Sequence, residues 1–545
     1  MPVTNDVSRD NAQSGKQALQ GWREPLAQGN SSARKRQQRI LGLLSVLLLI
    51  ILIFAAVRLT AFATAGSDEL QLHIGNQQVV TLDLRQSLPI NPDILGANVF
   101  PQIGTSSQDK ASGFMDYSAP LSAGLRDAHV KLLRFPGGSW GENHILTLDQ
   151  LSAFSTLLNE VDADGMLQAR LSGPTSAGFN ELTNLSSRVE LATRWIDFMN
   201  NAHSDQRIAR YAHVPYHPAK YWTVGDEPDT LIDPMTNRPY LVKDYVNAFI
   251  QFSIAMHHTD PTIKVFGPEL SQFYGPGAGP RDAQGTLWME GFLKGVGEYE
   301  QANHVVLLDG VSFHRFQFVG ATQTPYLFLS STGEWNYLLP ALHQLISQNV
   351  HRDLPVAITA INTNQPRQQP PPRGLAALWW ADTLATLLNQ QVAYVAFSSA
   401  SGMNMPYPLF TTDGLQPTPM LRVMQLFGQL QHNLIPLQVQ RDPTSVYATQ
   451  DSTHQTVSLL FINKSAEAQL VQMSGGNKPF GISPWPNLNV SLSGYAIVVV
   501  TLHRNSNAEA YSYVMHDAND PHAAAPLVHT VCGHKTDVLA HTAPC

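Results

Sequence analysis

The chain has 545 residues, which excludes a single small domain and suggests three or four units of about 150 residues, or one large α/β barrel with an added domain. Hydrophobic residues make up 43% and charged residues 14% of the sequence, which excludes global disorder. Eight basic and three acidic residues give positions 1–66 a charge of +5 and leave −13 for the remainder, so no nucleic-acid partner is expected for the body.

An uncharged run of 18 residues, ILGLLSVLLLIILIFAAV, begins at Ile40. As a helix it would span about 27 Å, close to the roughly 30 Å of a bilayer core. Four basic residues lie between positions 34 and 39 and one follows the run, so the positive-inside rule places the N-terminus in the cytoplasm. We predict a disordered cytoplasmic tail (1–39), a transmembrane anchor (40–58) and an extracytoplasmic body at the cell membrane. A cleaved signal peptide is the alternative, because Ala63-Thr64-Ala65 fits a cleavage site.

The first element expected in the body is a β-hairpin, assigned to residues 67–88. Polar and apolar residues alternate from Leu70 to Leu84 around the turn dipeptide Gly75-Asn76. Residues 89–432 then contain eight short β-like runs separated by helical patterns, which predicts a (β/α)8 TIM barrel of the α/β class. The runs are ILGANVF, VKLLRF, MLQARL, KYWTVG, IKVFG, DGVSFH, PVAITA and VAYVAF.

The helix after the third run has a clear amphipathic pattern. Ser187 and Glu190 predict a capping box at its start. Its apolar residues share one face, which is expected to pack on the barrel. They are Val189, Ala192, Trp195, Ile196 and Met199.

Residues 433–505 are rich in strand patterns and predict a C-terminal antiparallel β-sandwich, which the hairpin at 67–88 is expected to complete. Residues 506–545 are rich in Ala, His and Asp and are expected to form a loosely ordered tail. Its five histidines and Cys532 have no convincing ligand spacing, so neither a metal nor a cofactor is expected. Cys532 and Cys545 are the only cysteines and could pair outside the cell or have no role.

The strongest candidate for chemistry is Glu227. The functional side chains of such barrels lie at the C-terminal ends of the strands, and KYWTVGDEP places Glu227 just past the fourth strand beside Asp226. A buried carboxyl with an acidic neighbour can serve as a general acid, because both influences raise its pKa. A solvated loop carboxylate is the alternative.

The segment YWTVGDEPD resembles the acid/base motif of clan A glycoside hydrolases, which include arabinofuranosidase, xyloglucanase and xylosidase-like families. The resemblance extends over residues 90–505 and implies a carbohydrate partner, with Glu227 as the acid/base. LLRFPGGSWGENH is similar to the second-strand motif, which implies that Arg134 and its glycines shape the pocket floor. GVSFHRFQF is similar to the sixth strand and implies that His314 lies at the rim and contacts substrate.

The chain departs from the family at the seventh strand, PVAITAINTN, where the family carries its nucleophilic Glu and this sequence has Ala360. Retaining hydrolysis needs two carboxyls about 5–5.5 Å apart, and no Asp or Glu lies between Leu354 and Ala381. Asp226 replaces the family Asn that contacts the sugar, and Phe316 stands where a Tyr often supports the nucleophile. We therefore expect a degenerate nucleophile position and impaired catalysis.

Exposed aromatic rings at the barrel mouth could stack on sugars, and the expected platforms are Trp140, Trp335, Trp379 and Tyr407. Burial in the core is the alternative for each ring. Two alternatives remain for the function. One is an active glycosidase in which Glu142, Glu269 or Glu334 replaces the missing group, for example as the base of an inverting mechanism at roughly 6.5–9.5 Å from the acid. The other is a scaffold that binds a partner without turnover.

Overall fold

The computed structural model describes residues 48–51, 69–75, 78–102, 114–172, 184–234, 236–318, 324–364, 370–402, 405, 407–437, 442–475, 484–514 and 524–532. The chain forms two units, residues 1–65 and 66–545. Among the described residues no helix has both the length and the apolar character needed to cross a membrane. The predicted anchor at 40–58 lies outside the described residues, except for four helical residues at 48–51.

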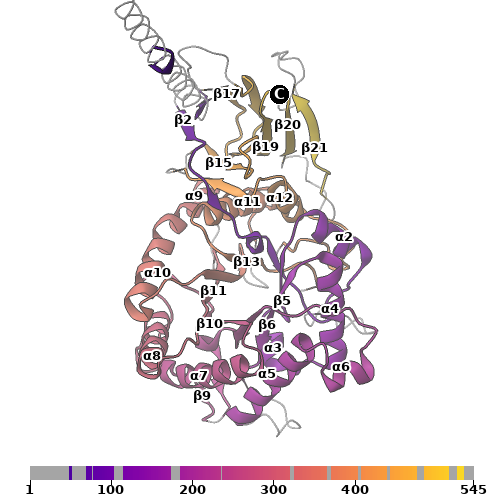
Figure 1. The fold of residues 1–545 in the computed structure, drawn as a ribbon, viewed down its shortest axis with the longest axis vertical. Coiled ribbons are helices and arrows are strands. Elements are labelled where there is room, and N and C mark those ends of the chain that lie inside the picture. The colour runs from indigo at the N-terminus through magenta and orange to yellow at the C-terminus, as the bar shows by residue number, and fades with distance from the viewer. Residues whose placement is uncertain are drawn as a thin grey trace, which may run out of the picture. The chain divides into compact units, whose positions relative to one another are not determined.

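The second unit is built around a closed barrel of eight parallel strands (Figure 1). All eight predicted runs supply one strand each, in the expected order, so the barrel prediction is confirmed. The strands are β4 (Gly96–Asn98), β5 (Leu132–Phe135), β6 (Asp164–Ala169), β7 (Tyr221–Val224), β10 (Lys264–Leu270), β11 (Gly310–Phe316), β12 (Val356–Asn362) and β13 (Tyr394–Phe397). Every residue of β12 is buried, as expected for a parallel strand covered by helices.

Helices surround this barrel. They are α2 (Ala119–Asp127), α3 (Trp140–Asn143), α4 (Leu148–Val161), α5 (Leu185–Asn200), α6 (Asp205–Arg210), α7 (Val242–Thr259), α8 (Trp288–Asn303), α9 (Pro325–Ser330), α10 (Trp335–Val350), α11 (Arg373–Asn389) and α12 (Pro419–Phe427). The capping box predicted at Ser187 is wrong, because α5 begins earlier and its cap is Asn184, whose side chain accepts from the Ser187 N–H. The predicted apolar face is otherwise buried, with Val189 partly so.

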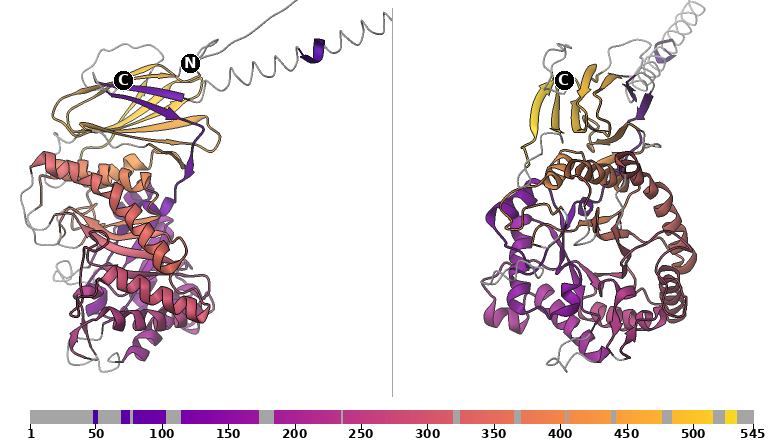
Figure 2. Two further views of the ribbon diagram at one scale, coloured as in Figure 1. Left: turned by 90° about the vertical axis from the view of Figure 1, so that its left-hand side faces the viewer. Right: turned by 180° about the vertical axis from the view of Figure 1, so that it is seen from behind.

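Two antiparallel sheets form the sandwich, and both ends of the second unit contribute to it (Figure 2). One sheet has the order β18 (Leu488–Leu492), β17 (Gln469–Gly475), β1 (Glu69–Ile74), β2 (Gln78–Asp83). The other has the order β21 (Val528–Cys532), β20 (Ala508–Val514), β19 (Ala496–His503), β16 (Thr456–Asn463), β15 (Thr444–Gln450), β14 (Asn433–Ile435), β3 (Leu88–Pro89). The predicted pairing of the N-terminal hairpin with the sandwich is confirmed.

The C-terminal segment departs from the prediction of a loosely ordered tail at 506–545. In the described part of this segment, Ala508–Val514 and Val528–Cys532 form β20 and β21, which extend the larger sheet from β19. Ala508 and Ala510 of β20 point into the sandwich core. Cys532, at the end of β21, is buried and disulfide-bonded.

Helix α11 packs between the barrel and the sandwich. It contacts β15, β16 and β19, while α12 contacts β19 and β20. Because the sheet covers the side that would otherwise face solvent, α11 is buried on almost every side. The barrel core continues through α11 into the sandwich, where it includes Leu460 and Val499. One face of the larger sheet therefore packs in the barrel core, whereas the space between the two sheets holds a separate hydrophobic cluster.

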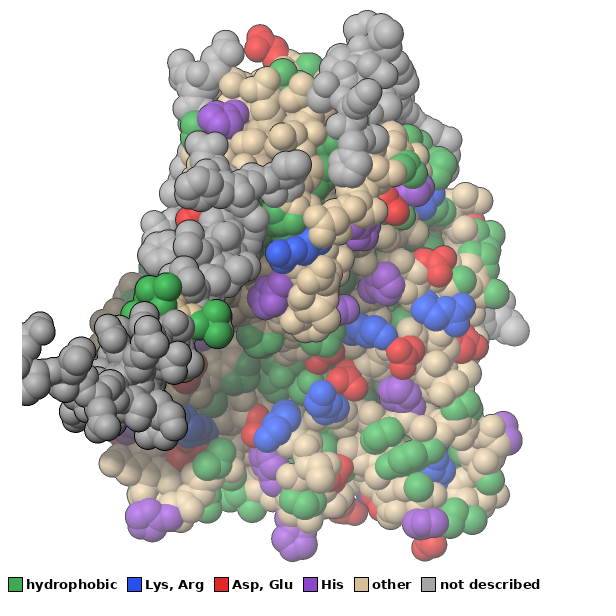
Figure 3. Space-filling view, turned by 45° about the horizontal axis from the view of Figure 1, so that its top comes forward, with side chains coloured by type: hydrophobic (Ala, Val, Ile, Leu, Met, Phe, Trp, Pro, Cys, Tyr) green, Lys and Arg blue, Asp and Glu red, His purple; other side chains and the backbone are tan. Residues whose placement is uncertain are grey.

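The start of the barrel strands is packed with side chains, which confines the candidate site to the other end. Leu132, Met166, Tyr221, Phe266 and Ala357 form a buried cluster there. On the face of the molecule drawn in Figure 3, basic side chains lie among acidic ones and form no single positive patch.

Candidate active site

A cavity of about 270 Å³ opens at the C-terminal ends of the barrel strands. Strands β4, β5, β7, β11, β12 and β13, or the residues just after them, contribute to its wall. The lining residues are Asn98, Phe100, Arg134, Gly137, Gly138, Ser139, Asp226, Glu227, His314, Phe316, Ala360, Ser398 and Met405. Arg134, Asp226, Glu227, His314 and Ala360, which the sequence selected, therefore line one cavity.

The backbone at Glu227 has an uncommon conformation that directs this residue into the cavity. Its φ is 49° and its ψ is 55°, the left-handed region that non-glycine residues seldom adopt. A hydrogen bond of 2.9 Å from its N–H to the Glu269 carbonyl holds the turn. The side chain remains 25% exposed, and its Oε1 lies 3.0 Å from Nδ1 of His314. Glu227 can thus reach a ligand while His314 fixes its orientation.

Below Glu227 lies a buried charge cluster of Arg134, Asp226, Glu269 and His314. Nη2 of Arg134 lies 2.8 Å from Oδ1 of Asp226 and 2.7 Å from Oε2 of Glu269. Nε2 of His314 lies 3.2 Å from Oε2 of Glu269. The exposed fraction is at most 3% for each of the four side chains. Opposite charges lie at hydrogen-bond distance from one another in this cluster. Their attraction therefore offsets the free-energy cost of burying each charge away from water.

The pKa values in this cluster follow from burial and from these contacts. Burial raises the pKa of Glu269, but Arg134 and the His314 hydrogen bond outweigh it and lower this pKa to about 2. Burial lowers the pKa of His314, but hydrogen bonds with Glu227 and Glu269 raise it to about 10. Burial raises the pKa of Asp226 to about 6 against the charges of His314 and Arg134. At neutral pH His314 is therefore a cation that donates from both ring nitrogens.

The wall that carries Ala360 is apolar. Ala360 pairs with His314 in the β11/β12 register, and 5% of its surface is exposed. Together with Phe316 and Met405 it forms a small hydrophobic cluster inside the cavity lining. The lining residues include two acids, Asp226 and Glu227, which are adjacent in the chain. This part of the cavity wall thus presents methyl, phenyl and thioether groups.

The glycines after β5 allow the chain to pass close to the cavity. Gly137 has a φ of +67°, and a Cβ there would lie 3.1 Å from the Val99 carbonyl oxygen and 3.3 Å from Asn98. A side chain at this position would press against the cavity lining.

The three replacement carboxylates proposed from the sequence are all engaged elsewhere. Glu142 is buried and accepts from Gln168 and from the backbone N–H groups of Leu171 and Ser172. Glu334 forms a forked ion pair with Arg315. Glu269 lies in the charge cluster and is fully buried. None of the three is among the residues that line the cavity.

Asp226, Glu269 and His314 bring three possible metal-ligand atoms within 4.8 Å of one another. The same space already contains the Arg134 guanidinium, which donates to both carboxylates. A metal ion there would be repelled by this cation and would have to displace it. The donor set therefore does not fit a metal site.

The interpretation of the tryptophans as sugar platforms is wrong. Trp335 and Trp379 are fully buried, in α10 and α11, because the surrounding elements cover both helices at these positions. Trp140 is 7% exposed, and His144 stacks on its ring at 4.5 Å. None of these three rings lines the cavity.

Five lining residues were not selected from the sequence, namely Asn98, Phe100, Ser139, Ser398 and Met405. Asn98 ends the first barrel strand, so the rule that strand ends carry the site could have found it. Its Nδ2 donates to the carbonyls of Thr359 and Ala396, and its Oδ1 accepts from Arg134 at 3.1 Å. Ser398 and Met405 lie in the segment after β13, where no sequence pattern indicates proximity to Glu227.

The barrel and sandwich are similar to solved glycoside hydrolases. A GH51 α-L-arabinofuranosidase from Thermotoga petrophila gives a TM-score of 0.56 at 14% identity, covering 76% of this chain and 98% of that one. A GH44 xyloglucanase from Paenibacillus polymyxa gives 0.52 at 13% identity, covering 76% and 97%. A bifunctional glucanase-xylanase from a metagenome library gives 0.53 at 14% identity, covering 77% and 97%.

No protein-family model matches the chain, and no curated protein sequence does. At identities of 12–15% the structural likeness establishes the fold. The chain therefore has the fold of clan A glycoside hydrolases such as the GH51 arabinofuranosidases and GH44 xyloglucanases, a closed eight-stranded barrel joined to antiparallel sheets.

Proposed function

We propose that the chain binds a poly- or oligosaccharide in the Glu227 cavity and has little or no retaining glycosidase activity. The observation that carries this proposal is the pairing of Glu227 with an apolar wall of Ala360, Phe316 and Met405 in one cavity. A carboxylate that attacks the anomeric carbon is required for the retaining mechanism. Glu227 could donate a proton to a leaving group, but the opposite wall offers no nucleophile.

The similar structures support carbohydrate as the ligand class, since those proteins are arabinofuranosidases, a glucanase-xylanase and xyloglucanases. The cavity retains polar groups suited to sugar hydroxyls, including Ser139 and Ser398.

An active enzyme with a replacement carboxylate is less well supported. Glu269 has a pKa lowered to about 2 and accepts from Arg134 and His314, so its anionic oxygen is committed to two cations. General acid catalysis by Glu227 alone would supply about 10²–10⁴-fold, short of the roughly 10⁶-fold or more typical of enzymes.

Binding and turnover can be separated with neutral arabinan, xylan and xyloglucan oligosaccharides. We expect calorimetry to detect binding of these oligosaccharides to the chain, and we expect no release of reducing ends from them. Glu227→Gln should weaken binding by about tenfold, because a hydrogen bond to a charged group is lost. Glu298→Gln is the control, since Glu298 is an exposed residue of α8. Rapid hydrolysis by the unmodified chain that Glu227→Gln abolishes would reject the proposal, and absence of any saccharide binding would favour a scaffold.

We further propose that residues 40–58 anchor the chain in the cell membrane with its body outside, a proposal supported by the 18-residue apolar run and the preceding basic residues. Protease added to intact spheroplasts is expected to digest the body and spare residues 1–39, which immunoblotting with antibodies to each part can follow. A body that resists digestion until the cells are lysed would contradict this topology.

A further inference from the structure

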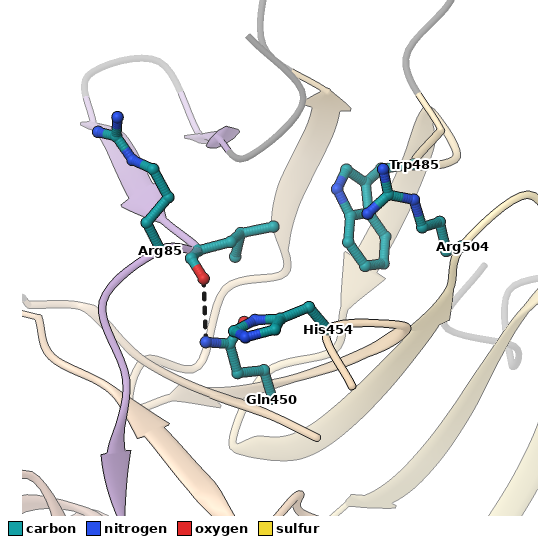
Figure 4. A pocket seen from close by; sticks show the side chains of 6 residues that line it. Arg85, Gln450, His454, Trp485 and Arg504 are labelled. Carbon is teal, nitrogen blue, oxygen red and sulfur yellow. Dashed lines mark hydrogen bonds between the residues drawn. The ribbon is translucent and has the colours of Figure 1, made fainter. Parts of the chain in front are cut away.

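A second cavity, of about 350 Å³, lies between the two sheets of the sandwich (Figure 4). Both sheets contribute to it, through residues at the ends of β2, β15 and β19 and ahead of β18. Its lining residues are Leu84, Arg85, Gln450, His454, Trp485 and Arg504. It shares no lining residue with the Glu227 cavity.

The two arginines of this cavity differ in their partners. Arg85 forms a fork with Asp83, with Nε 2.8 Å from Oδ1 and Nη2 2.9 Å from Oδ2. The backbone N–H of Arg504 donates to the Gln455 carbonyl. The residue is partly buried, and its guanidinium contacts no acceptor among the residues that the structure describes. A partly desolvated guanidinium lacks compensation unless a bound anion supplies it.

Gln450 contributes an unused acceptor to the same cavity. Its side chain is fully buried, and its Nε2 donates to the Leu84 carbonyl at 3.0 Å, the bond drawn in Figure 4. Reversing the amide would direct Oε1 at another acceptor, so this bond fixes the orientation. Oε1 has no hydrogen-bond partner among the described residues. A buried acceptor without a donor costs free energy, which a hydroxyl of a ligand would recover.

The other lining groups set the shape of the cavity. Figure 4 shows Trp485 and Arg504 together on the side opposite Arg85, with His454 and Gln450 below them. Trp485 and Leu84 are buried and supply apolar walls. The ring of His454 has no side-chain partner within the described part of the chain and offers a further donor or acceptor.

We propose that this cavity binds a uronic acid residue of an acidic glycan. The carboxylate would accept from Arg504, and a ring hydroxyl would donate to Oε1 of Gln450, so one ligand satisfies both unpaired groups. A neutral sugar would leave Arg504 without an anion. Sulfate has no hydroxyl to donate to Gln450 and no apolar face to contact the Trp485 wall. The sandwich would then hold an acidic polysaccharide independently of the barrel.

Calorimetry on the full chain in detergent can test this assignment with glucuronate, galacturonate and their short oligomers. Uronates are expected to bind at least about tenfold more tightly than glucose or xylose, because one hydrogen-bonded charge pair is added. Arg504→Gln should remove this preference, whereas Arg504→Lys should retain part of it. Arg85→Gln is the matched control and should have a smaller effect, because Asp83 already engages Arg85.

Two further measurements keep the outcome unambiguous. Glu227→Gln should leave the uronate affinity of the sandwich cavity unchanged. The proposal for this cavity and the proposal for the barrel cavity can therefore be rejected independently of each other. Trp485→Phe should remove any uronate-induced change in tryptophan fluorescence. Equal affinity for sulfate and uronate, or an Arg504→Gln chain with normal thermal unfolding and unchanged uronate affinity, would overturn the proposal.

Discussion

Replacing Ala360 with glutamate is expected to raise the hydrolysis rate of aryl arabinofuranosides or aryl β-glycosides by about 10²-fold or more, the gap between general acid catalysis alone and a typical enzyme. The substitution places a carboxylate on the wall of the cavity that Glu227 also lines. Release of the aryl group can be followed by absorbance, and NMR of the first product should show retained anomeric configuration.

Phe316 and Met405 pack against Ala360, so the new carboxylate would be partly desolvated and its pKa raised. Phe316→Tyr adds a hydroxyl that can donate to it, and Asp226→Asn removes a neighbouring charge. Each addition is therefore expected to increase the activity of the Ala360→Glu chain.

Ala360→Gln is the matched control, because glutamine has a similar shape but cannot attack the anomeric carbon. Adding Glu227→Gln to the Ala360→Glu chain should abolish the gain. If Ala360→Glu and Ala360→Gln behaved identically in a folded protein, Ala360 would not occupy the nucleophile position.

Arg134→Met is expected to destabilise the barrel by about 3–5 kcal/mol, because it leaves two buried carboxylates without their shared cation. Arg134 is fully buried and donates through one nitrogen to Asp226 and Glu269. Urea unfolding followed by tryptophan fluorescence can measure the loss. Arg207→Met is the control, since Arg207 is also buried but donates to backbone carbonyls, so its removal strands no carboxylate.

The loss of stability caused by Arg134→Met should also depend on pH. In the unmodified chain Glu269 has a lowered pKa, so its stabilising contribution is present above its unfolded pKa of about 4.3 and is lost only as pH falls through about 2. Without Arg134 the stabilising contribution of ionised Glu269 is removed, and protonation of the two buried carboxylates that have lost their cation becomes favourable. The difference between the two chains should therefore shrink from pH 7 to pH 5. Adding Glu269→Gln to Arg134→Met should recover part of the stability, whereas equal losses at both pH values would contradict this account.

The barrel could be predicted from the sequence because each strand is a short apolar run between turn signals, a pattern that is local. The segments β20 and β21 could not, because β20 turns the small side chains of Ala508 and Ala510 inward. Such residues give little hydrophobic signal, although their alternation with Glu509 and Tyr511 fits a half-buried strand.

The place of Glu227 in the cavity could be predicted from its position after a strand, and the places of Arg134 and His314 from the resemblance to clan A glycoside hydrolases. The burial of Trp379 could not, because its ring packs against Phe318 and Phe328, which only the fold brings to α11 from an earlier part of the chain. The four-member charge cluster also required the structure, since only the fold brings Glu269 of β10 to Arg134 of β5.

The sandwich closes through partners that are synthesised far apart in time. Leu70 of β1 pairs with Gly475 of β17, and the whole barrel lies between them in the sequence. During synthesis at about 5–20 residues per second, β1 and β2 leave the ribosome long before β17 exists. The β1–β2 hairpin has only two strands, and a two-stranded hairpin is marginally stable in isolation. Completion of the smaller sheet is therefore a late step that follows translation of the barrel.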